Sequence, residues 1–339
     1  MAWRYYKSGD AGAPVLNGVA GSLITLLDAV LTGPSGDGSG NAYGSKPCAG
    51  WSKQFSGTNK AVYRAAAGST TRFSYRVLDD GSGAVGARDA ALRGFRTMSD
   101  VDTGTAPFPT TSDRPNGTSL GKSTALNSNP VQWFILASGQ TFVMGVLVGR
   151  WQVAYVGEFD SFTPSDALNA VVIGAAAGST PDGFSASQIA GIYQTVNAAA
   201  TDWGNDHGVA IAGNSGQGAT CVNGSLMHSS GVFCPTDTGS NGDDGWGKLP
   251  RVNPADGAVY TADILVNEYG TPWGTRGKLR GVYAMPHKGT LWDDQETYSG
   301  AGDLAGKEFL VLRMTPYQTY VGSPDPTNCL MAFEISNTL

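Results

Sequence analysis

The sequence predicts a mainly β protein built from antiparallel sheets or β-sandwich-like layers, with two or three packed α-helices. Charged residues make up only 15% of the 339 residues, where roughly 25% is usual, which is too few for long solvated helices. The 48 glycines and 17 prolines indicate many short strands joined by tight turns. Several segments also alternate apolar and polar residues, which is the period of a half-buried strand.

Two segments have the helical period instead. At about residues 22–32, Ser22 precedes an apolar stripe at i, i+3, i+4, i+7 spacing, and Gly33-Pro34 ends it. This stripe consists of Leu23, Leu26, Leu27, Val30 and Leu31. A second helix is expected at about residues 186–199, where residues 185–188 have capping-box spacing. Its apolar side is formed by Ile189, Ile192, Tyr193 and Val196. We expect both helices to pack on sheets.

Strands are expected where apolar and polar residues alternate, as at residues 71–78, and where turn residues bound an apolar segment. In the first half they are residues 3–7, 50–55, 60–65, 71–78, 90–98, 131–136, 141–148 and 151–159. Gly94 lies inside one of them and predicts a bulge or a close approach of another chain segment. Residues 102–130 are polar and contain prolines, so a surface excursion is expected there. Later strands are expected at 208–212, 231–234, 260–266, 279–285, 309–314 and 330–335.

A domain boundary near residue 160 would divide the chain into two β domains. Residues 1–160 would form an assembly or docking domain with the first helix. Residues 161–339 would hold the second helix and a glycine-rich, exposed loop region at 200–260. Neither a repeat of 20 to 50 residues nor a sustained heptad pattern occurs, so neither a solenoid nor a coiled-coil shaft is expected.

The charge pattern bears on partners. The net charge is −6 and no basic run occurs, which argues against nucleic acid as a partner. No stretch of about 18 apolar residues exists, so membrane insertion is not expected. The first eight residues lack the apolar core of a signal peptide, so we expect synthesis in a cytoplasm. There, Cys48, Cys221, Cys234 and Cys329 are expected as buried free thiols; Cys221 and Cys234 are the only plausible local disulfide.

Catalytic patterns are weak. Ser215 lies in a glycine-rich loop with Asp206 and His207 nearby, but position 217 is glutamine, so the GxSxG pattern of a nucleophile elbow is not met. The other histidines, His228 and His287, are isolated. No glycine-rich stretch has the strand–loop–helix context of a nucleotide site. The sequence therefore predicts no enzyme and no cofactor.

Clustered carboxylates allow two further hypotheses. Residues 237–245 form an oxygen-rich loop, but Gly239 and Lys248 stand where an EF-hand needs ligands. A solvated turn is the alternative to a weak calcium site at Asp237, Asn241, Asp243 and Asp244. The groups at residues 293–296 and at Glu158 with Asp160 have the composition of a glycosidase pair, although carboxylate pairs are common. If the chain were a polysaccharide depolymerase, changing Asp293 or Asp294 would abolish sugar release.

Four tryptophans lie in glycine-flanked, loop-like regions. They are Trp203, Trp246, Trp273 and Trp292. A tryptophan in such a loop either buries itself or stays available as an anchor for another subunit or a sugar ring. We therefore regard these four as interface candidates.

Several series of residues carry a resemblance. Residues 98–109 read MSDVDTGTAPFP, and they follow GWSKQFSGTNKAVYR at 50–64 and FSYRVLDDG at 73–81. Near the other end stand RGKLRGVY at 276–283 and YSGAGDLAGKEFL at 298–310. Together these series resemble a family of virion structural proteins of tailed bacteriophages. The likeness is strongest in residues 1–110 and 276–313, and residues 200–260 are not matched.

The resemblance implies a virion component without catalytic residues. The tail is the expected location, at the tail tip, baseplate or fibre base. A receptor-binding protein of the tail, or a neck or capsid decoration protein, is the alternative. Expected partners are a second copy of the chain in a trimeric or hexameric ring, other virion proteins, and a host surface glycan or protein. Synthesis would take place in the host bacterial cytoplasm.

The loop at residues 98–109 suits such a role. Short oxygen side chains at 99–103 can accept hydrogen bonds from nearby backbone amides and stabilise a turn. The prolines at 107 and 109 force an extended path afterwards. Phe108 would then either contact a neighbouring subunit or pack on its own domain, and we include it among the interface candidates.

Overall fold

The computed structural model describes ten ranges of the chain. They are residues 3–82, 86–111, 115–174, 209–212, 221–228, 261–268, 274–285, 294–300, 304–314 and 329–335. Within them the protein is mainly β, and its sheets are antiparallel throughout. This part of the prediction is confirmed. The described part contains a single short α-helix instead of two or three.

The smaller of the two main sheets has six strands, all from the first 121 residues. Its strands are β4 (Ser52–Gly57), β5 (Lys60–Arg64), β6 (Ser74–Leu78), β7 (Asp89–Met98), β8 (Gly104–Phe108) and β9 (Thr118–Gly121). The first five follow one another in order, and β9 pairs with the N-terminal half of β7. A 3-10 turn, Gly86–Arg88, leads into β7. Strands β2 (Asn41–Tyr43) and β3 (Lys46–Pro47) form a separate hairpin.

The larger sheet has 13 strands and runs β1-β10-β11-β12-β14-β15-β16-β17-β18-β21-β20-β19. Its first strands are β1 (Arg4–Lys7), β10 (Trp133–Ala137), β11 (Thr141–Val148), β12 (Arg150–Glu158), β13 (Asp160–Ser161), β14 (Ala170–Ile173) and β15 (Val209–Ala212). The remaining ones are β16 (Cys221–His228), β17 (Ala262–Glu268), β18 (Gly274–Met285), β19 (Thr297–Ser299), β20 (Glu308–Met314) and β21 (Cys329–Glu334).

A ring of strands closes within this sheet. Strand β13 follows β12 after one residue but pairs with β18 instead of β14, through Asp160 opposite Lys278 and Ser161 opposite Gly277. Because β12 is also joined to β18 through β14, β15, β16 and β17, the path of paired strands returns to its start through the one residue that links β12 to β13. The sheet thus curls into a barrel-like closure, which removes free edges from this region.

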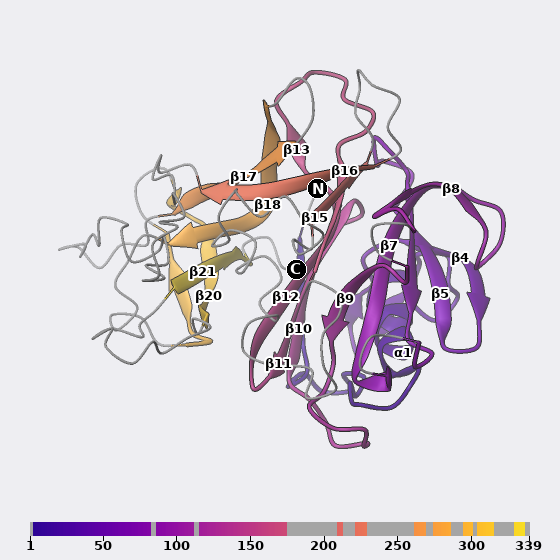
Figure 1. Cartoon of the computed structure of the whole chain (residues 1–339). Coiled ribbons are helices and arrows are strands. Elements are labelled where there is room, and N and C mark those ends of the chain that lie inside the picture. Colours follow the sequence, from indigo (N-terminus) through magenta and orange to yellow (C-terminus); the bar gives the residue numbers. More distant parts are fainter. Residues whose placement is uncertain are drawn as a thin grey trace, which may run out of the picture.

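The strands lie in three layers (Figure 1): the small sheet with the helix, the central strands β10–β12, and the C-terminal strands β17, β18, β20 and β21. Side chains of the central layer alternate between two cores. Ile135 and Met144 face the first core, with the helix and the small sheet. Phe134 and Val143 face the second, with the C-terminal strands. Because both faces are covered, almost every residue of β10 and β11 is buried.

The predicted first helix is present in a shortened form. It comprises α1 (Ser22–Leu27) and a continuing π-helical turn, Asp28–Thr32. All five residues of the predicted stripe have no exposed surface, and the segment ends at Gly33, whose φ of 68° favours glycine. Ser22, however, does not cap the helix. The Leu23 amide donates instead to Asp79 Oδ2, at 2.8 Å, so the cap comes from the end of a strand 56 residues away.

Other predictions need correction. Residues 102–130 are not a surface excursion, because they supply β8 and β9 to the small sheet. Strand β16 lies in the region expected to be loop-like, and β14 was not predicted. The expected helix at 186–199 and the expected strand at 231–234 lie outside the described residues. The boundary near residue 160 stays a prediction; the large sheet crosses it through the pairing of β12 with β14.

The close approach predicted at Gly94 is present. Gly94 on β7 lies opposite Phe108 on β8, and the Phe108 ring occupies the space where a side chain would start. A Cβ at position 94 would lie 2.0 Å from Phe108 Cζ. We expect Gly94→Ala to lower the free energy of unfolding by about 1–3 kcal/mol, the usual cost of overpacking a core. Urea denaturation followed by tryptophan fluorescence measures this change.

Gly9→Ala is the matched control, because no atom lies within 4 Å of a Cβ placed there. We expect that variant to stay within about 0.5 kcal/mol of the parent protein, as surface substitutions usually do. Equal effects of the two substitutions would show that the ring of Phe108 does not limit position 94.

Candidate functional site

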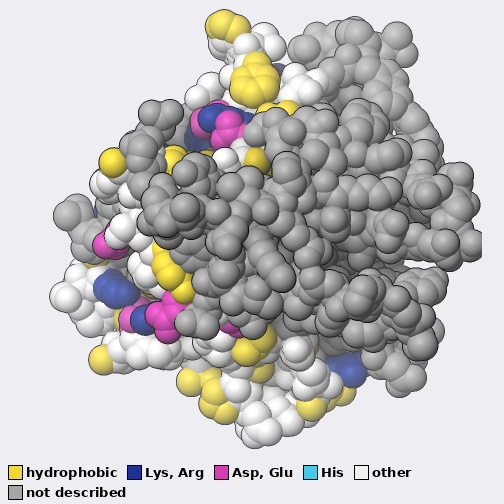
Figure 2. Space-filling view, turned by 90° about the vertical axis from the view of Figure 1, so that its left-hand side faces the viewer, with side chains coloured by type: hydrophobic (Ala, Val, Ile, Leu, Met, Phe, Trp, Pro, Cys, Tyr) yellow, Lys and Arg dark blue, Asp and Glu magenta, His cyan; other side chains and the backbone are white. Residues whose placement is uncertain are grey.

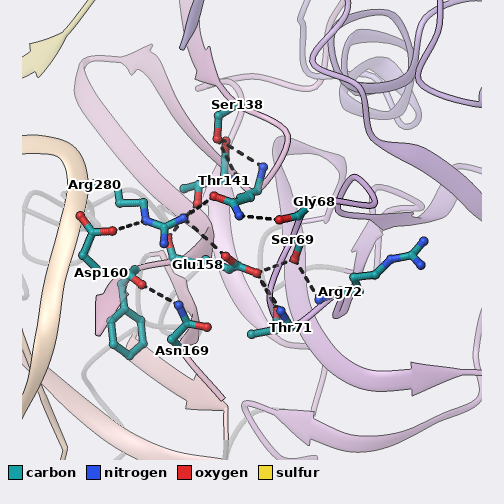
Figure 3. A network of polar contacts seen from close by, with 12 residues as sticks. Gly68, Ser69, Thr71, Arg72, Ser138, Thr141, Glu158, Asp160, Asn169 and Arg280 are labelled. Carbon is teal, nitrogen blue, oxygen red and sulfur yellow. Dashed lines mark hydrogen bonds and ion pairs between the residues drawn. The ribbon is translucent and has the colours of Figure 1, made fainter. Parts of the chain in front are cut away.

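The carboxylate pair Glu158 and Asp160 lies where β12 gives way to β13 (Figure 3). The Glu158 side chain has no exposed surface. Its Oε1 atom accepts hydrogen bonds from the Ser69 hydroxyl, the Thr71 amide at 2.9 Å and the Thr71 hydroxyl at 3.2 Å. Its Oε2 atom accepts from Arg280 at 3.4 Å. Glu158 thus joins the loop after β5 to the ring of strands.

Arg280 of β18 connects the pair to its surroundings. Its guanidinium donates to Asp160 at 2.6 Å and to the side-chain oxygen of Gln140 at 2.6 Å. Its backbone amide donates to the Tyr155 hydroxyl at 3.2 Å, and that hydroxyl donates to the Glu158 carbonyl at 2.6 Å. Arg280 therefore contacts both carboxylates. Its bonds connect β18 to the end of β12, to β13 and to Gln140.

This arrangement does not suit general acid–base catalysis by this pair. A glycosidase needs both carboxyl groups facing a substrate, one of them able to give up a proton. Glu158 is inaccessible and its oxygen atoms are occupied by protein donors. We interpret the network as the joint that holds β12, β13 and β18 together.

A second joint lies beside it. The Arg276 guanidinium makes two bonds of 3.1 Å to the Asp166 carboxylate, one to each oxygen. It also donates to the carbonyls of Leu168 at 2.9 Å and Ala212 at 3.2 Å, and it lies over the Phe159 ring at 5.6 Å. Both charged side chains are almost fully buried. Arg276 therefore ties β18, β15 and the loop between β13 and β14 into one unit.

The pKa of Asp166 makes this joint sensitive to acid. Burial by itself would raise that pKa, but the hydrogen bonds and charge of Arg276, with bonds from Leu168 and Ser161, hold it below its usual value. A carboxyl whose pKa is lower in the folded state stabilises the fold above its unfolded pKa of about 3.9. This contribution disappears as the pH falls through the folded pKa.

We therefore expect the parent protein to lose stability more steeply below about pH 4 than Asp166→Asn, which cannot ionise. Thermal unfolding from pH 6 to pH 3, measured for both proteins in the same buffers, gives the difference between them. Parallel pH profiles would contradict the assignment.

A buried ion pair connects the small sheet to the helix. The ammonium of Lys122 pairs with Asp79, and neither side chain has exposed surface. Lys122 also donates to the Val19 carbonyl at 3.0 Å. Burial raises the pKa of Asp79 and lowers that of Lys122, so each group depends on the other to remain charged. Because Asp79 also holds the Leu23 amide, the pair fixes the first turn of α1.

Of the predicted interface residues, the structure describes Phe108 alone. Its side chain has no exposed surface and contacts the rings of Phe73 and Tyr75, at centroid distances of 5.6 and 6.1 Å. The loop therefore packs on its own domain, which was the second of the two alternatives. In this fold the Phe108 ring fills the space left by the absent side chain of Gly94 and has no exposed surface with which to contact a neighbouring subunit.

The tryptophan, calcium and serine candidates lie outside the described ranges. This holds for Trp203, Trp246, Trp273 and Trp292, for the calcium candidates Asp237, Asn241, Asp243 and Asp244, and for Asp206, His207 and Ser215. Within the described ranges, no three histidine, cysteine or acidic side chains lie close enough to hold a metal ion.

Cys48 is buried with a free thiol, as expected. Among the described residues, no helix could span a membrane.

Sequence reasoning missed two surface features. Val15, Val19 and Leu126 are about half or more exposed and lie on two loops in contact, since the Gly18 amide donates to Asn127 at 3.0 Å. A cleft of about 550 Å³ lies at the β1 end of the large sheet, and its wall includes Trp133 and Trp151. Both tryptophans come from strands whose pattern indicated only core.

Neither a comparison with protein-family models nor one with curated proteins finds a match for this chain.

Proposed function

We propose that this chain is a structural component of a tailed-phage particle, located in the tail, where it assembles as a ring and docks other virion proteins. The observation that carries the proposal is the resemblance of the residue series at 50–109 and 276–310 to virion structural proteins. A β-rich fold whose buried charges join strands is compatible with a mechanical role. Neck or capsid decoration stays the alternative location.

The distribution of charge supports assembly through neutral surfaces. Several surface cations pair with carboxylates of the same chain, for example Lys46 with Asp10 at 2.6 Å and Lys307 with Glu334 at 2.9 Å. On the face in Figure 2, described basic and acidic side chains lie beside one another in small groups. Such a surface favours subunit contacts that depend on complementary shape and buried apolar area. Attraction between oppositely charged patches contributes less.

The exposed side chains Val15, Val19 and Leu126 are the described residues best suited to contact a second copy. They project from two loops held together by the bridge of Leu16 with Val131. The Val19 backbone is anchored by Lys122, so the position of this apolar surface is fixed before association. Fixing a surface in advance reduces the entropy lost on binding.

Mass spectrometry of purified particles tests the virion assignment. We expect the chain to be present in intact, nuclease-treated particles at a copy number that is a multiple of three. Its absence from particles, while it is present in the infected-cell lysate, would overturn the proposal. Immunogold labelling then separates tail from neck and capsid.

Light scattering after size-exclusion chromatography tests the ring. We expect the purified chain to form trimers or hexamers, and the double substitution Val19→Asp with Leu126→Asp to shift it to monomers. Phe162→Asp is the matched control, because Phe162 is also more than half exposed but lies on another loop, beside β18. If the double variant remains oligomeric, this surface is not the contact.

A further inference from the structure

The buried pair of Lys122 and Asp79 places an amino group directly against a carboxyl group inside the protein. Neither side chain has exposed surface, and Lys122 Nζ donates to Asp79 Oδ1. Because Oδ1 is bonded to Cγ, the nitrogen lies beside the carbon of the carboxyl group. Asp79 directly follows β6 and Lys122 directly follows β9, and these two strands pair with opposite edges of β7. A covalent bond between the two side chains would therefore span three strands.

The hydrogen bonds of the Lys122 ammonium fix the direction of its nitrogen. Besides Asp79 Oδ1, Nζ donates to the Val19 carbonyl at 3.0 Å and to the Ser22 hydroxyl at 3.4 Å. If the proton shared with Asp79 moves to the carboxylate, the other two bonds still hold the nitrogen. The lone pair left behind then points to the carboxyl group. This is the orientation that a nucleophilic amine needs, and the fold provides it in advance.

The second oxygen of the carboxylate is held as well. Asp79 Oδ2 accepts a hydrogen bond from the Leu23 amide at 2.8 Å, at the first turn of α1. When an amine attacks a carboxyl carbon, negative charge develops on the oxygen that stays, and a fixed amide donor stabilises that charge. The two oxygens thus have separate roles. Oδ2 is retained, and Oδ1, beside the ammonium, can take up a proton and leave.

Burial favours the neutral forms of both groups. It raises the pKa of Asp79 and lowers that of Lys122, so the transfer of one proton between them costs less than it would in water. Two buried charges carry a desolvation cost, whereas an amide carries no charge. Because neither side chain is exposed, water also has little access for the reverse reaction, hydrolysis. The site therefore favours condensation more than the same two groups would in solution.

We propose that Lys122 and Asp79 condense into an intramolecular isopeptide bond after the chain has folded. A proton passes from the ammonium to Asp79 Oδ1, and the neutral amine attacks Cγ. A bond forms between Nζ and Cγ, the bond between Cγ and Oδ1 breaks, and a second proton from the nitrogen completes the water molecule that leaves. The reaction balances without an oxidant, a metal or another substrate. The proposal goes beyond the structural role and does not depend on where in a particle the chain resides.

The mass of the denatured full chain tests the proposal. We expect the parent protein to be lighter by one water molecule than its sequence requires. Proteolysis should give a branched peptide in which Lys122 is joined to Asp79. A succinimide at Asp80-Gly81 would also remove one water molecule but would not join two peptides. A parent chain of full sequence mass, a loss of water without the branched peptide, or a branch at another residue would overturn the proposal.

Two variants connect the mass to the pair. Lys122→Arg keeps a positive charge for Asp79, but the guanidinium stays protonated and is not a nucleophile, so we expect this variant to have its full sequence mass. Lys53→Met is the matched control, because Lys53 pairs with Asp28 at a partly exposed site, and it should lose water as the parent does. Water loss in Lys122→Arg, or none in Lys53→Met, would contradict the assignment. None of these outcomes bears on the presence of the chain in virions.

Discussion

Replacing Lys122 with methionine is expected to destabilise the protein by about 3–5 kcal/mol, because it leaves the Asp79 carboxylate buried without its cation. Asp79 has no exposed surface, so water cannot take the place of the ammonium. The loss reaches beyond the pair, since Asp79 also accepts from the amide of Leu23 at the start of α1. Equilibrium unfolding in urea at pH 7 measures the change.

The double variant Asp79→Asn with Lys122→Met separates the charge from the packing. A neutral asparagine keeps an oxygen for the Leu23 amide, so we expect the double variant to be more stable than Lys122→Met alone. Lys53→Met is the comparison at the surface, where the pair of Lys53 with Asp28 is about 30% exposed on both sides. That variant should lose no more than about 1 kcal/mol. Equal losses for Lys122→Met and Lys53→Met would contradict the argument.

The second large effect is expected at Arg276. Arg276→Met removes both bonds to Asp166 and the donors to the carbonyls of Leu168 and Ala212. The Asp166 carboxylate then keeps only its bonds from Ser161 and the Leu168 amide. Because it loses its cation inside the fold, we again expect a loss of about 3–5 kcal/mol. Arg276→Lys should fall between, since an ammonium cannot bind both oxygens of Asp166 in the same way.

Hydrogen exchange shows whether the effect is local to the joint. We expect backbone amides of residues 159–170 to exchange faster in Arg276→Met, since Arg276 holds that loop against β18. Lys278→Met is the matched control two residues along the same strand, where the pair with Asp263 is more than one-third exposed. Unchanged protection in the loop, or the same change in both variants, would show that Arg276 is not its anchor.

Local pattern was informative where the period was strong. The stripe of Leu23 to Leu31 predicted the helix, and the strand expected at residues 141–148, between two glycine turns, is β11 with its bounds as observed. Gly94 signalled a close approach inside a strand, and the Phe108 ring fills that space. These features follow from neighbours in sequence, because the spacing of apolar residues decides which face a chain segment buries.

Contacts between residues far apart in the sequence could not be predicted from local patterns. Ser22 had the residue type of a cap, yet Asp79, which lies 56 residues after Leu23, holds the first turn. Residues 102–130 looked like a loop because their polar side chains are satisfied by strands of the small sheet, as Lys122 is by Asp79. Strand β8 likewise lies wholly within the proline-bearing loop of residues 98–109, and its pairing with β7 appears only in the sheet.

The sequence by itself determined that this is a charge-poor, antiparallel β protein with a short apolar helix, and it carries the resemblance on which the virion proposal rests. Tertiary structure alone decided what the charged and aromatic groups do. Glu158 and Asp160 form a joint because Arg280 of β18 reaches both. Trp133, Trp151 and Gln295 form a cleft because the curled sheet brings β10, β12 and the loop before β19 together. The burial of a side chain and the identity of its hydrogen-bond partners depend on the whole fold, so a local sequence pattern cannot predict them.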